Sequence, residues 1–584
     1  MPPPPPLAES QPDRARTLVH WIVLFAILSV GAWLRSHLNN TGTAGLVFMR
    51  TDESHYTKMV GEFLQGDWKV DYFVNPTLYM YLLYAATSVS GWIGVATGHY
   101  DSFGEMAIDA TMDPYLVTII GRSISLIVGV GSIALIYHLA CRLFSTRAGL
   151  IAALLLAVNM THTDRGALAG NELPMVLTLL LCFHALVRYL EQPTTGRHLL
   201  AGLFLGLAAS FKYNAGIQMV ALLVATLTAL VDPQTREAPL WSRIRQARHW
   251  AAFPAAAIGF LIGSPYVLLN FAEFWIDFRF QSDLLHSGFG EHRTGWTYYI
   301  LQLGPGNSGW PVAAFMLLGL GVCLFRALGM RDKRCILALA AVLPTYLLLG
   351  GGIFCQMRFL LPAIPILILM ASGTLDTIAR MAPRVGLHSS LATSVLTATL
   401  VSAMVGPHAW GLQKRMAARY GERDPRAELV DWMREKIPAG THCFELHTDP
   451  GALFFPLASN ARKLRDKSFD TPGQKMRYEQ LQKDSFRADS MRKTVLNSKD
   501  LVAFEAALLQ AEQTHLILSL FSPRRIVKKE LDSEIQRIVS NLKMKRDAPY
   551  WRDAAMSIMK MKKVGQITSS DRRYVVCVLE LPRP

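Results

Sequence analysis

Two adjacent carboxylates, Asp52 and Glu53, are the residues of this chain best suited to chemistry. His55 and Tyr56 follow Asp52 at the i+3 and i+4 positions, so on a helix they share its face. A carboxylate with orienting neighbours can act as a general base that takes a proton from a hydroxyl. We therefore predict that Asp52 is a catalytic base. Glu53 would hold the acceptor or a neighbouring cation, or else cap the helix that begins nearby.

Basic residues that could meet an anion lie farther along the chain. Lys212 follows the apolar residues 203–211, where an unpaired ammonium is costly unless an anionic group meets it. A phosphate is one such partner, and Arg358 offers a bidentate fork for the same group. Other polar residues also lie where apolar runs end, namely Asn75, Asp164, Arg165, Glu172, Tyr213 and Asn214. For Asp164 and Asn214 we favour an ordinary role at a membrane boundary.

The composition indicates a polytopic membrane protein. Of 584 residues, 51% are hydrophobic and only 18% are charged, and the mean hydropathy is +0.24. The net charge of +15 does not indicate a nucleic-acid partner, because the arginines lie mainly in short segments between apolar runs. Such segments mark the cytoplasmic ends of membrane spans. The Pro-rich residues 1–14 read as a disordered tail.

The elements that must position these side chains are membrane helices. The first apolar run, residues 18–34, follows Arg14 and Arg16 and reads as an uncleaved signal anchor. Alternating basic loops predict about eleven crossings, with Asp52 outside and the loop around Arg331 inside. The predicted spans are residues 18–34, 116–140, 148–160, 173–190, 199–210, 215–231, 251–269, 309–325, 336–351, 359–377 and 391–405.

Two outer segments leave alternatives open. Residues 76–96 are apolar enough to span, but parity and their tyrosines favour a helix that lies at the membrane surface. The long loop of residues 270–307 is rich in aromatic side chains. It either anchors at the interface or forms a lid over a site.

Several ordered motifs resemble the GT-C glycosyltransferases, in the branch of protein O-mannosyltransferases and bacterial lipid A aminoarabinose transferases. The resemblance covers roughly residues 15–410. It rests on Asp52-Glu53, Asn75-Pro76-Thr77-Leu78-Tyr79, Gly121-Arg122, Arg142-Leu143-Phe144, Arg147-Ala148-Gly149-Leu150, Asn171-Glu172-Leu173-Pro174, Gly206 to Tyr213, and Arg358-Phe359-Leu360-Leu361-Pro362. One position departs from the family, since Asn75 stands where a basic residue often precedes the proline.

The resemblance implies transfer of a sugar from a polyprenyl-phosphate donor to an acceptor on the extracytoplasmic face, with inversion. The catalytic residues would be Asp52 and Glu53. Lys212 and Arg358 would bind the carrier phosphate, with His55 as a further phosphate or sugar contact and Tyr213 beside them. Glu172 would bind a sugar hydroxyl or stabilise the outer loop. The acceptor stays open among protein, lipid and glycan, and the implied location is a bacterial cytoplasmic membrane.

The expected fold is a polytopic α-helical membrane protein. It has a GT-C-like core of about eleven transmembrane helices at residues 15–408 and an extracytoplasmic α/β domain at residues 409–584. In the second domain we predict helices near residues 425–436 and 528–545, and strands near 441–446, 514–520 and 573–581. Cys443 and Cys577 lie in two of these strands and could form a disulfide if the strands are neighbours.

The sequence favours no metal site and firmly implies no cofactor, although Asp52 and Glu53 could recruit a divalent cation. The main alternative function is a transporter or flippase of lipid-linked sugars or small solutes. Transporters place polar sites near the middle of the bilayer, often with internal repeats. Here the strongest charges collect at one boundary of the spans.

Overall fold

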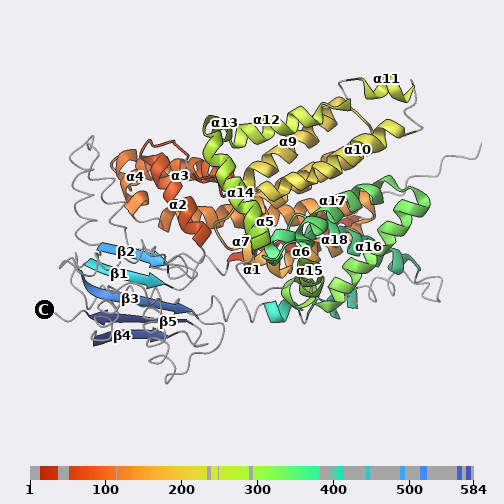
Figure 1. Ribbon diagram of the computed structural model, residues 1–584. Helices are drawn as coiled ribbons and strands as arrows, with labels where there is room; N and C mark the ends of the chain where they lie inside the picture. Colours follow the sequence, from red (N-terminus) through yellow and green to blue (C-terminus); the bar gives the residue numbers. More distant parts are fainter. Residues whose placement is uncertain are drawn as a thin grey trace, which may run out of the picture.

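The computed structural model divides into a helical bundle and a small β-sheet (Figure 1). It describes residues 14–36, residues 51–381 apart from 71, 113–114, 233–238, 247–248 and 288–293, most of residues 398–412, and five strands between residues 442 and 580. The predicted helices at residues 425–436 and 528–545 lie outside the described residues. The predicted mixture of a polytopic helical core and a strand-containing C-terminal part is confirmed.

The bundle consists mainly of long apolar helices. Its main helices are α1 (Arg14–Ser36), α5 (Tyr115–Leu143), α6 (Thr146–Ala157), α8 (Glu172–Glu191), α9 (Thr195–Phe211), α10 (Met219–Val231), α12 (Ala252–Gly263), α16 (Trp310–Met330), α17 (Lys333–Gly350) and α18 (Ile364–Met381). Each of the first ten predicted spans therefore contains a helix. Residues 391–405 lie largely outside the described part of the chain. In the described part, eight helices are long and apolar enough to cross a membrane, and α6 and α12 are shorter apolar helices.

Shorter elements gather at the ends of the bundle. They are α2 (Thr51–Leu64), α4 (Phe103–Met112), α7 (Met160–Gly166), α11 (Leu240–Ile244), α13 (Tyr266–Leu269), α14 (Phe271–Ser287), α15 (Gly295–Gln302), and the helical turns η1 (Tyr213–Gln218), η4 (Gly304–Ser308) and η5 (Met357–Leu360). The predicted span 251–269 is interrupted, because α12 ends at Gly263 and Ser264 has a non-helical backbone.

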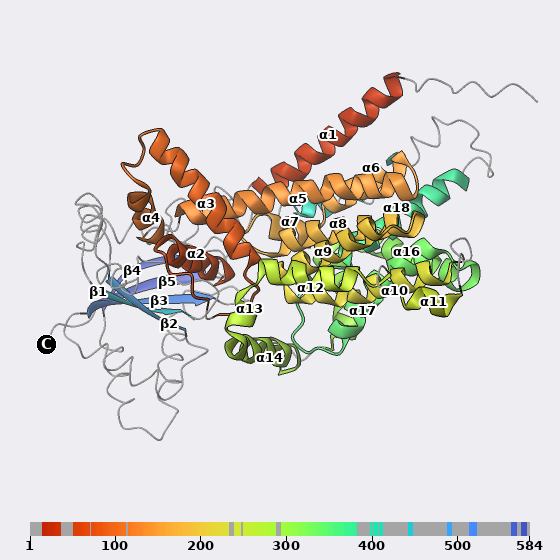
Figure 2. The same cartoon turned by 90° about the horizontal axis from the view of Figure 1, so that it is seen from above.

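The helix α3 (Leu78–Ala96) has the length and hydropathy of a membrane span, so it counts among the eight candidates. It packs against α2, α4 and α5, and both views place it with α2 and α4 at one end of the bundle (Figure 2). Surface and spanning helices share this composition. Our preference for a helix at the membrane surface therefore stays a prediction.

A close crossing of α9 and α12 fixes where α9 ends. Gly202 and Gly206 lie four residues apart on one face of α9. A Cβ atom at Gly202 would come within 2.0 Å of the Ala252 carbonyl oxygen, and one at Gly206 within 2.0 Å of the Ala256 carbonyl oxygen. Small residues at this spacing let two membrane helices approach to backbone contact. The crossing holds the last turn of α9, and with it Lys212, at a defined place.

One buried ion pair ties α2 to α5. The Arg122 guanidinium donates to both oxygens of Glu53, at 3.0 Å each, and the Ala169 backbone N–H donates to Glu53 Oε1 at 2.8 Å. The exposed fractions of the Arg122 and Glu53 side chains are 1% and 0%. A charge buried this deeply needs a partner in place, so the pair fixes the start of α2 against α5 and the segment before α8.

The end of the bundle away from α2 carries ion pairs between helices. Arg142 pairs with Glu191, and Arg334 lies 3.6 Å from the same carboxylate. Arg147 Nε donates to Asp376 Oδ1 at 2.9 Å. These residues come from loops or helix ends that the sequence assigns to the cytoplasmic side. The fold therefore gathers the predicted inner loops at one end of the bundle.

The five strands form one mixed sheet beyond the end that carries α2 and α4 (Figures 1 and 2). Their order is β2 (Arg487–Arg492), β1 (His442–His447), β3 (Gln513–Phe521), β5 (Tyr574–Glu580), β4 (Lys562–Thr568). The β2–β1 and β1–β3 pairs are parallel, and the β3–β5 and β5–β4 pairs are antiparallel. The three predicted strands correspond to β1, β3 and β5, while β2 and β4 were not predicted.

The suggested disulfide between Cys443 and Cys577 is wrong. The strands that carry these residues, β1 and β5, are separated by β3, so they are not neighbours. Cys443 is in register with His515 and Cys577 with Leu518. Two strand spacings and three residues of offset put their Cα atoms roughly 14 Å apart. A disulfide requires less than about 7 Å.

Replacing Arg122 by Leu should destabilise the protein by about 3–5 kcal/mol, because Glu53 would stay buried without its cation. Thermal unfolding in detergent would measure the loss. Lys58→Leu is the control, since it removes only the exposed pair with Glu62 at 3.9 Å and should cost about 0–1 kcal/mol. Equal midpoints for the two variants would contradict the role of the pair. Adding Glu53→Leu to Arg122→Leu should recover part of the loss.

Single cysteines at Lys58 and Gln192 should label from opposite sides of the membrane. Exposed Lys58 lies on α2, and exposed Gln192 follows Glu191, whose ion pairs lie at the other end of the bundle. The measurement is reaction with a membrane-impermeant maleimide in a background without the seven native cysteines. A cysteine at His99 should label from the same side as Lys58 if α3 lies on the surface. Labelling of Lys58 and Gln192 from one side would overturn the predicted topology.

Candidate active site

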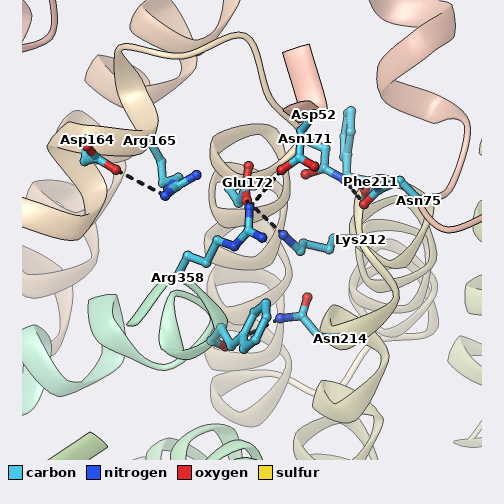
Figure 3. Close-up of polar contacts among 11 residues, drawn as sticks. Asp52, Asn75, Asp164, Arg165, Asn171, Glu172, Phe211, Lys212, Asn214 and Arg358 are labelled. Carbon is cyan, nitrogen blue, oxygen red and sulfur yellow. Dashed lines mark hydrogen bonds and ion pairs between the residues drawn. The ribbon is translucent and has the colours of Figure 1, made fainter. Parts of the chain in front are cut away.

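Four charged side chains meet at the end of the bundle nearest α2, and we call them the charge array: Asp52, Glu172, Lys212 and Arg358 (Figure 3). Lys212 Nζ donates to Glu172 Oε1 at 2.9 Å. Arg358 Nη1 lies 3.5 Å from the same oxygen and donates to Asp52 Oδ2 at 2.8 Å. Arg358 therefore bridges the two carboxylates, and the array alternates cation and anion.

The array is assembled from the ends of helices. Glu172 is the first residue of α8, and Lys212 caps the end of α9, which packs against α8. A carboxylate in the first turn also interacts favourably with the helix dipole. Arg358 lies in η5, between α17 and α18, and Asp52 is in the first turn of α2. Four segments far apart in sequence are thus needed to build one site.

The four members differ in their access to solvent. The Glu172 side chain is 6% exposed and the Asp52 side chain is 40% exposed, while the two cations are mostly buried. Burial lowers the pKa of Lys212 from its ordinary value, and the attraction of Glu172 offsets this only in part. Glu172 is therefore an internal counter-ion for both cations, and Asp52 is the carboxylate of the array that is open to solvent.

Glu53 does not join the array. Its carboxylate turns into the bundle, where it holds Arg122 and the Ala169 N–H. Of the alternatives for Glu53, the geometry matches contact with a neighbouring cation. Its buried position makes it a positioning residue for α2 rather than a group that touches substrate.

His55 and Tyr213 each contact a neighbouring segment near the array. The His55 ring packs on Tyr72, with ring centroids 3.7 Å apart. The Tyr213 hydroxyl donates to the Phe73 carbonyl oxygen at 2.9 Å. Burial, together with the nearby Asp52 carboxylate, raises the pKa of Tyr72 to about 12. The His55 and Tyr72 rings therefore form an aromatic wall near Asp52.

Three asparagines brace the segments around the array (Figure 3). Asn171 Nδ2 donates to the Phe211 carbonyl oxygen at 2.7 Å and to Asn75 Oδ1 at 3.2 Å. Asn214 Nδ2 donates to the Phe359 carbonyl oxygen at 3.5 Å. Asn75, at the family's often basic position, thus links two loops and brings no charge.

The short helix α7 adds a third cation near Glu172 that the sequence reasoning left without a role. Arg165 pairs with Asp164, with Nη2 and Oδ2 3.2 Å apart, and its charge also acts on Glu172. The N-cap Asn159 starts α7 by accepting from the His162 N–H at 3.0 Å. The buried Arg35 of α1 donates to His162 Nδ1 at 2.6 Å. The signal for Arg165 was present, since an arginine in an apolar surrounding requires partners.

A cavity of about 320 Å³ opens beside Lys212. Apolar side chains cover most of its wall, among them Phe278, Leu285, Leu348, Phe354 and Phe359, and Lys212 and several other polar side chains complete it. The aromatic loop supplies one wall through α14, which is fixed by Asp277 Oδ2 accepting from the Phe73 N–H at 2.6 Å. This loop therefore shapes the site.

Among the described residues, no three His, Cys, Asp or Glu side chains cluster as a set of metal ligands. Asp52 already faces the Arg358 guanidinium, which supplies positive charge to the site through the chain's own residues.

Comparison with known families gives one match. Residues 119–269 match the family described as dolichyl-phosphate-mannose-protein mannosyltransferase. This segment contains Arg122, α7, Glu172 and Lys212. No curated protein sequence matches the chain significantly.

Solved structures share the fold. ArnT from Cupriavidus metallidurans in the apo state is 15% identical, with a TM-score of 0.51 over 96% of this chain and 98% of that one. The same protein bound to undecaprenyl phosphate is 12% identical, with a TM-score of 0.50 over 97% and 98%.

The oligosaccharyltransferase from Archaeoglobus fulgidus in complex with zinc and sulfate is 11% identical, with a TM-score of 0.50 over 85% of this chain and 68% of that one. These identities demonstrate a common fold. With the family match on residues 119–269, which contain Glu172 and Lys212, they support an integral membrane glycosyltransferase with the GT-C fold.

Proposed function

We propose that this enzyme transfers a sugar from a polyprenyl-phosphate donor to an acceptor hydroxyl, with inversion at the anomeric carbon and with Asp52 as the general base. The observation that carries the proposal is the charge array. It places a solvent-reachable carboxylate and two buried cations within one site. Such a displacement needs a base for the attacking group and positive charge for the leaving phosphate.

The cations of the array suit the phosphate of the carrier. Lys212 presents a compact charge, and Arg358 offers several donors from one plane. Among the described residues, the buried Arg358 Nε has no hydrogen-bond partner, so it is available to a phosphate oxygen. Arg165 adds a third positive charge near Glu172.

In the proposed reaction, the acceptor hydroxyl gives its proton to Asp52 as its oxygen attacks the anomeric carbon. The bond between that carbon and the phosphate oxygen breaks, and Lys212 and Arg358 stabilise the negative charge left on the phosphate. A single displacement from the face opposite the phosphate inverts the configuration. Arg358 is shared between Asp52 and the phosphate, so arrival of the donor would loosen its bond to the base.

The cavity beside Lys212 suits the first isoprenoid units of the carrier, because its wall is largely apolar. The structural relative bound to undecaprenyl phosphate supports this choice of donor. His55 and Tyr213 are proposed to line the sugar. The acceptor stays open among protein, lipid and glycan, because side-chain chemistry at the array does not select among hydroxyls.

We further propose that the site faces the extracytoplasmic side of a bacterial cytoplasmic membrane. The separation of the array from the end rich in arginine supports this orientation. In this arrangement residues 15–408 form the transferase core, and residues 409–584 form an outer domain.

Asp52→Asn should lower the rate of sugar transfer by roughly 10²–10⁴-fold, because an amide keeps the shape but cannot accept the proton. It should also bind polyprenyl phosphate several-fold more tightly, because Arg358 no longer has a carboxylate partner at 2.8 Å. Transfer from radiolabelled polyprenyl-phosphate sugars and direct carrier binding would measure the two effects.

Asp67→Asn is the matched control, since Asp67 is an exposed loop residue and should leave both quantities unchanged. In the Asp52→Asn/Arg358→Gln double variant the gain in carrier affinity should vanish. Near-native transfer by Asp52→Asn would exclude Asp52 as the base. Unchanged carrier affinity in Arg358→Gln would exclude Arg358 as a phosphate contact.

The affinity of the protein for the polyprenyl-phosphate carrier should fall at alkaline pH. Binding requires the Lys212 ammonium, and its pKa is lowered by burial, so the charge is lost as the pH rises through that lowered value. Lys212→Arg should remove this alkaline fall, because arginine stays protonated. The measurement is carrier affinity against pH for both proteins. A parallel decline in Lys212→Arg would show that another group titrates.

A further inference from the structure

The first membrane helix, α1, meets the bundle through a fully buried cation. Arg35 lies in the last turn of α1, and its side chain has no exposed surface. Earlier in the helix, large side chains such as Leu18 and Phe25 are exposed, and Figure 2 shows α1 standing apart from the bundle toward its N-terminal end. A guanidinium buried at the end of a membrane span needs acceptors in fixed places.

The acceptors of Arg35 come from three helices. Within α1, Nη1 donates to the Gly31 carbonyl oxygen at 2.7 Å. At the end of α6, Nη1 donates to the Ala157 carbonyl oxygen at 3.1 Å and Nη2 to the Leu156 carbonyl oxygen at 3.3 Å. Carbonyl groups at the C-terminal end of a helix favour a cation. Nη2 also donates to His162 Nδ1 of α7 at 2.6 Å.

The bond to His162 fixes the state of that ring. An arginine side chain can only donate, so Nδ1 is the acceptor and the ring proton lies on Nε2. A proton on Nδ1 would bring two cations into contact, and both side chains are fully buried. His162 therefore remains a neutral acceptor, and Arg35 holds α7 through a directional bond.

Packing adds a second link between Arg35 and α7. A Cβ atom at Gly166, the last residue of α7, would come within 2.7 Å of Arg35 Cδ and 2.9 Å of Arg35 Cγ. A Cβ atom at Gly129 of α5 would lie 3.2 Å from Arg35 Nε. The stem of Arg35 thus lies against glycine positions of α5 and α7. Both the stem and the charged end of this side chain contact α7.

The position of α7 determines where parts of the charge array lie. Residues 167–171, all buried, join α7 directly to Glu172 at the start of α8. Within this segment the Ala169 N–H donates to Glu53 Oε1 at 2.8 Å, which ties the segment to α2. The helix α7 also packs against η5, which carries Arg358. A displacement of α7 would therefore move both a carboxylate and a cation of the array.

We infer that Arg35 is a positioning residue of the active site. Through His162 and Gly166 it holds α7, and α7 places Glu172 and Arg358 for the carrier phosphate. The hydrogen bonds of Arg35 to the described residues reach no member of the array, so Arg35 acts through α7. The inference rests on the proposed function, in which the array binds that phosphate. It gives α1 a part in catalysis beyond anchoring the chain in the membrane.

The test compares Arg35→Met with Leu24→Ala in full-length protein in lipid nanodiscs, using the radiolabelled polyprenyl-phosphate sugar that the wild-type protein accepts. Arg35→Met should lower kcat/KM by roughly 10–10²-fold, because small displacements of catalytic groups are costly. The donor KM should rise while kcat falls. Leu24 is also buried on α1, so Leu24→Ala should lower the unfolding midpoint but leave KM unchanged. Loss of folded protein alone lowers only the apparent kcat.

A second pair of variants keeps the guanidinium in place. Gly166→Ala should displace the stem of Arg35, so the donor KM should rise here too. Gly196→Ala is the matched control, because a Cβ atom at Gly196 meets nothing within 4 Å, and it should keep the wild-type KM. The Arg35→Met/His162→Phe double variant should be no more impaired than the worse single variant, since both changes break one link.

Hydrogen exchange followed by mass spectrometry tests the hold on α7 without any transfer reaction. Peptides from residues 160–171 should exchange faster in Arg35→Met than in the wild-type protein or Leu24→Ala. Unchanged exchange in these peptides, a wild-type KM in Arg35→Met, or multiplied defects in the double variant would each overturn the inference. If the wild-type protein transfers no sugar, the proposed function fails, while the exchange rates still decide whether Arg35 holds α7.

Discussion

The buried carboxylate of Glu172 is the constraint on which the active end depends. A carboxylate at the start of a membrane helix is costly unless cations meet it. Here Lys212 and Arg358 do so, from the end of α9 and from η5. Because each cation must reach the same oxygen, the ends of α8, α9 and the loop before α18 are drawn together. Arg358 then extends the arrangement to Asp52. A substrate phosphate would enter a site whose positive charge is already positioned.

The neighbouring residues Asp52 and Glu53 illustrate how a helix divides two similar side chains. Successive residues on a helix point about 100° apart, so when one faces the site the next faces the bundle. Glu53 meets Arg122 inside the protein, while Asp52 stays 40% exposed at the array. The buried pair holds α2 in place, and α2 presents Asp52. One carboxylate thereby supports the position of the other, and of the two only Asp52 is open to solvent.

Close packing between helices sets the dimensions around this chemistry. The glycines of α9 allow backbone contact with α12. This contact fixes the end of α9 and therefore the position of Lys212. The helix α14 forms one wall of the cavity beside Lys212, and Asp277 holds this helix in place by accepting from the Phe73 N–H. At the other end, carboxylates and arginines join the helix ends, with Asp376 and Glu191 each serving two arginines. The two ends of the bundle therefore have distinct chemistry, one suited to an anionic substrate and one to a membrane boundary.

The sequence by itself determined the polytopic helical core, most of its spans, three of the five strands and the residues that make the charge array. These are readable because hydropathy and periodicity are local properties of the chain. It did not determine that Glu53 pairs with Arg122, that α12 ends at Gly263, or that β3 separates the strands of Cys443 and Cys577. Only the tertiary structure decided these points, because the partner of a buried charge, the end of a helix in a bundle and the order of strands depend on segments far away in sequence.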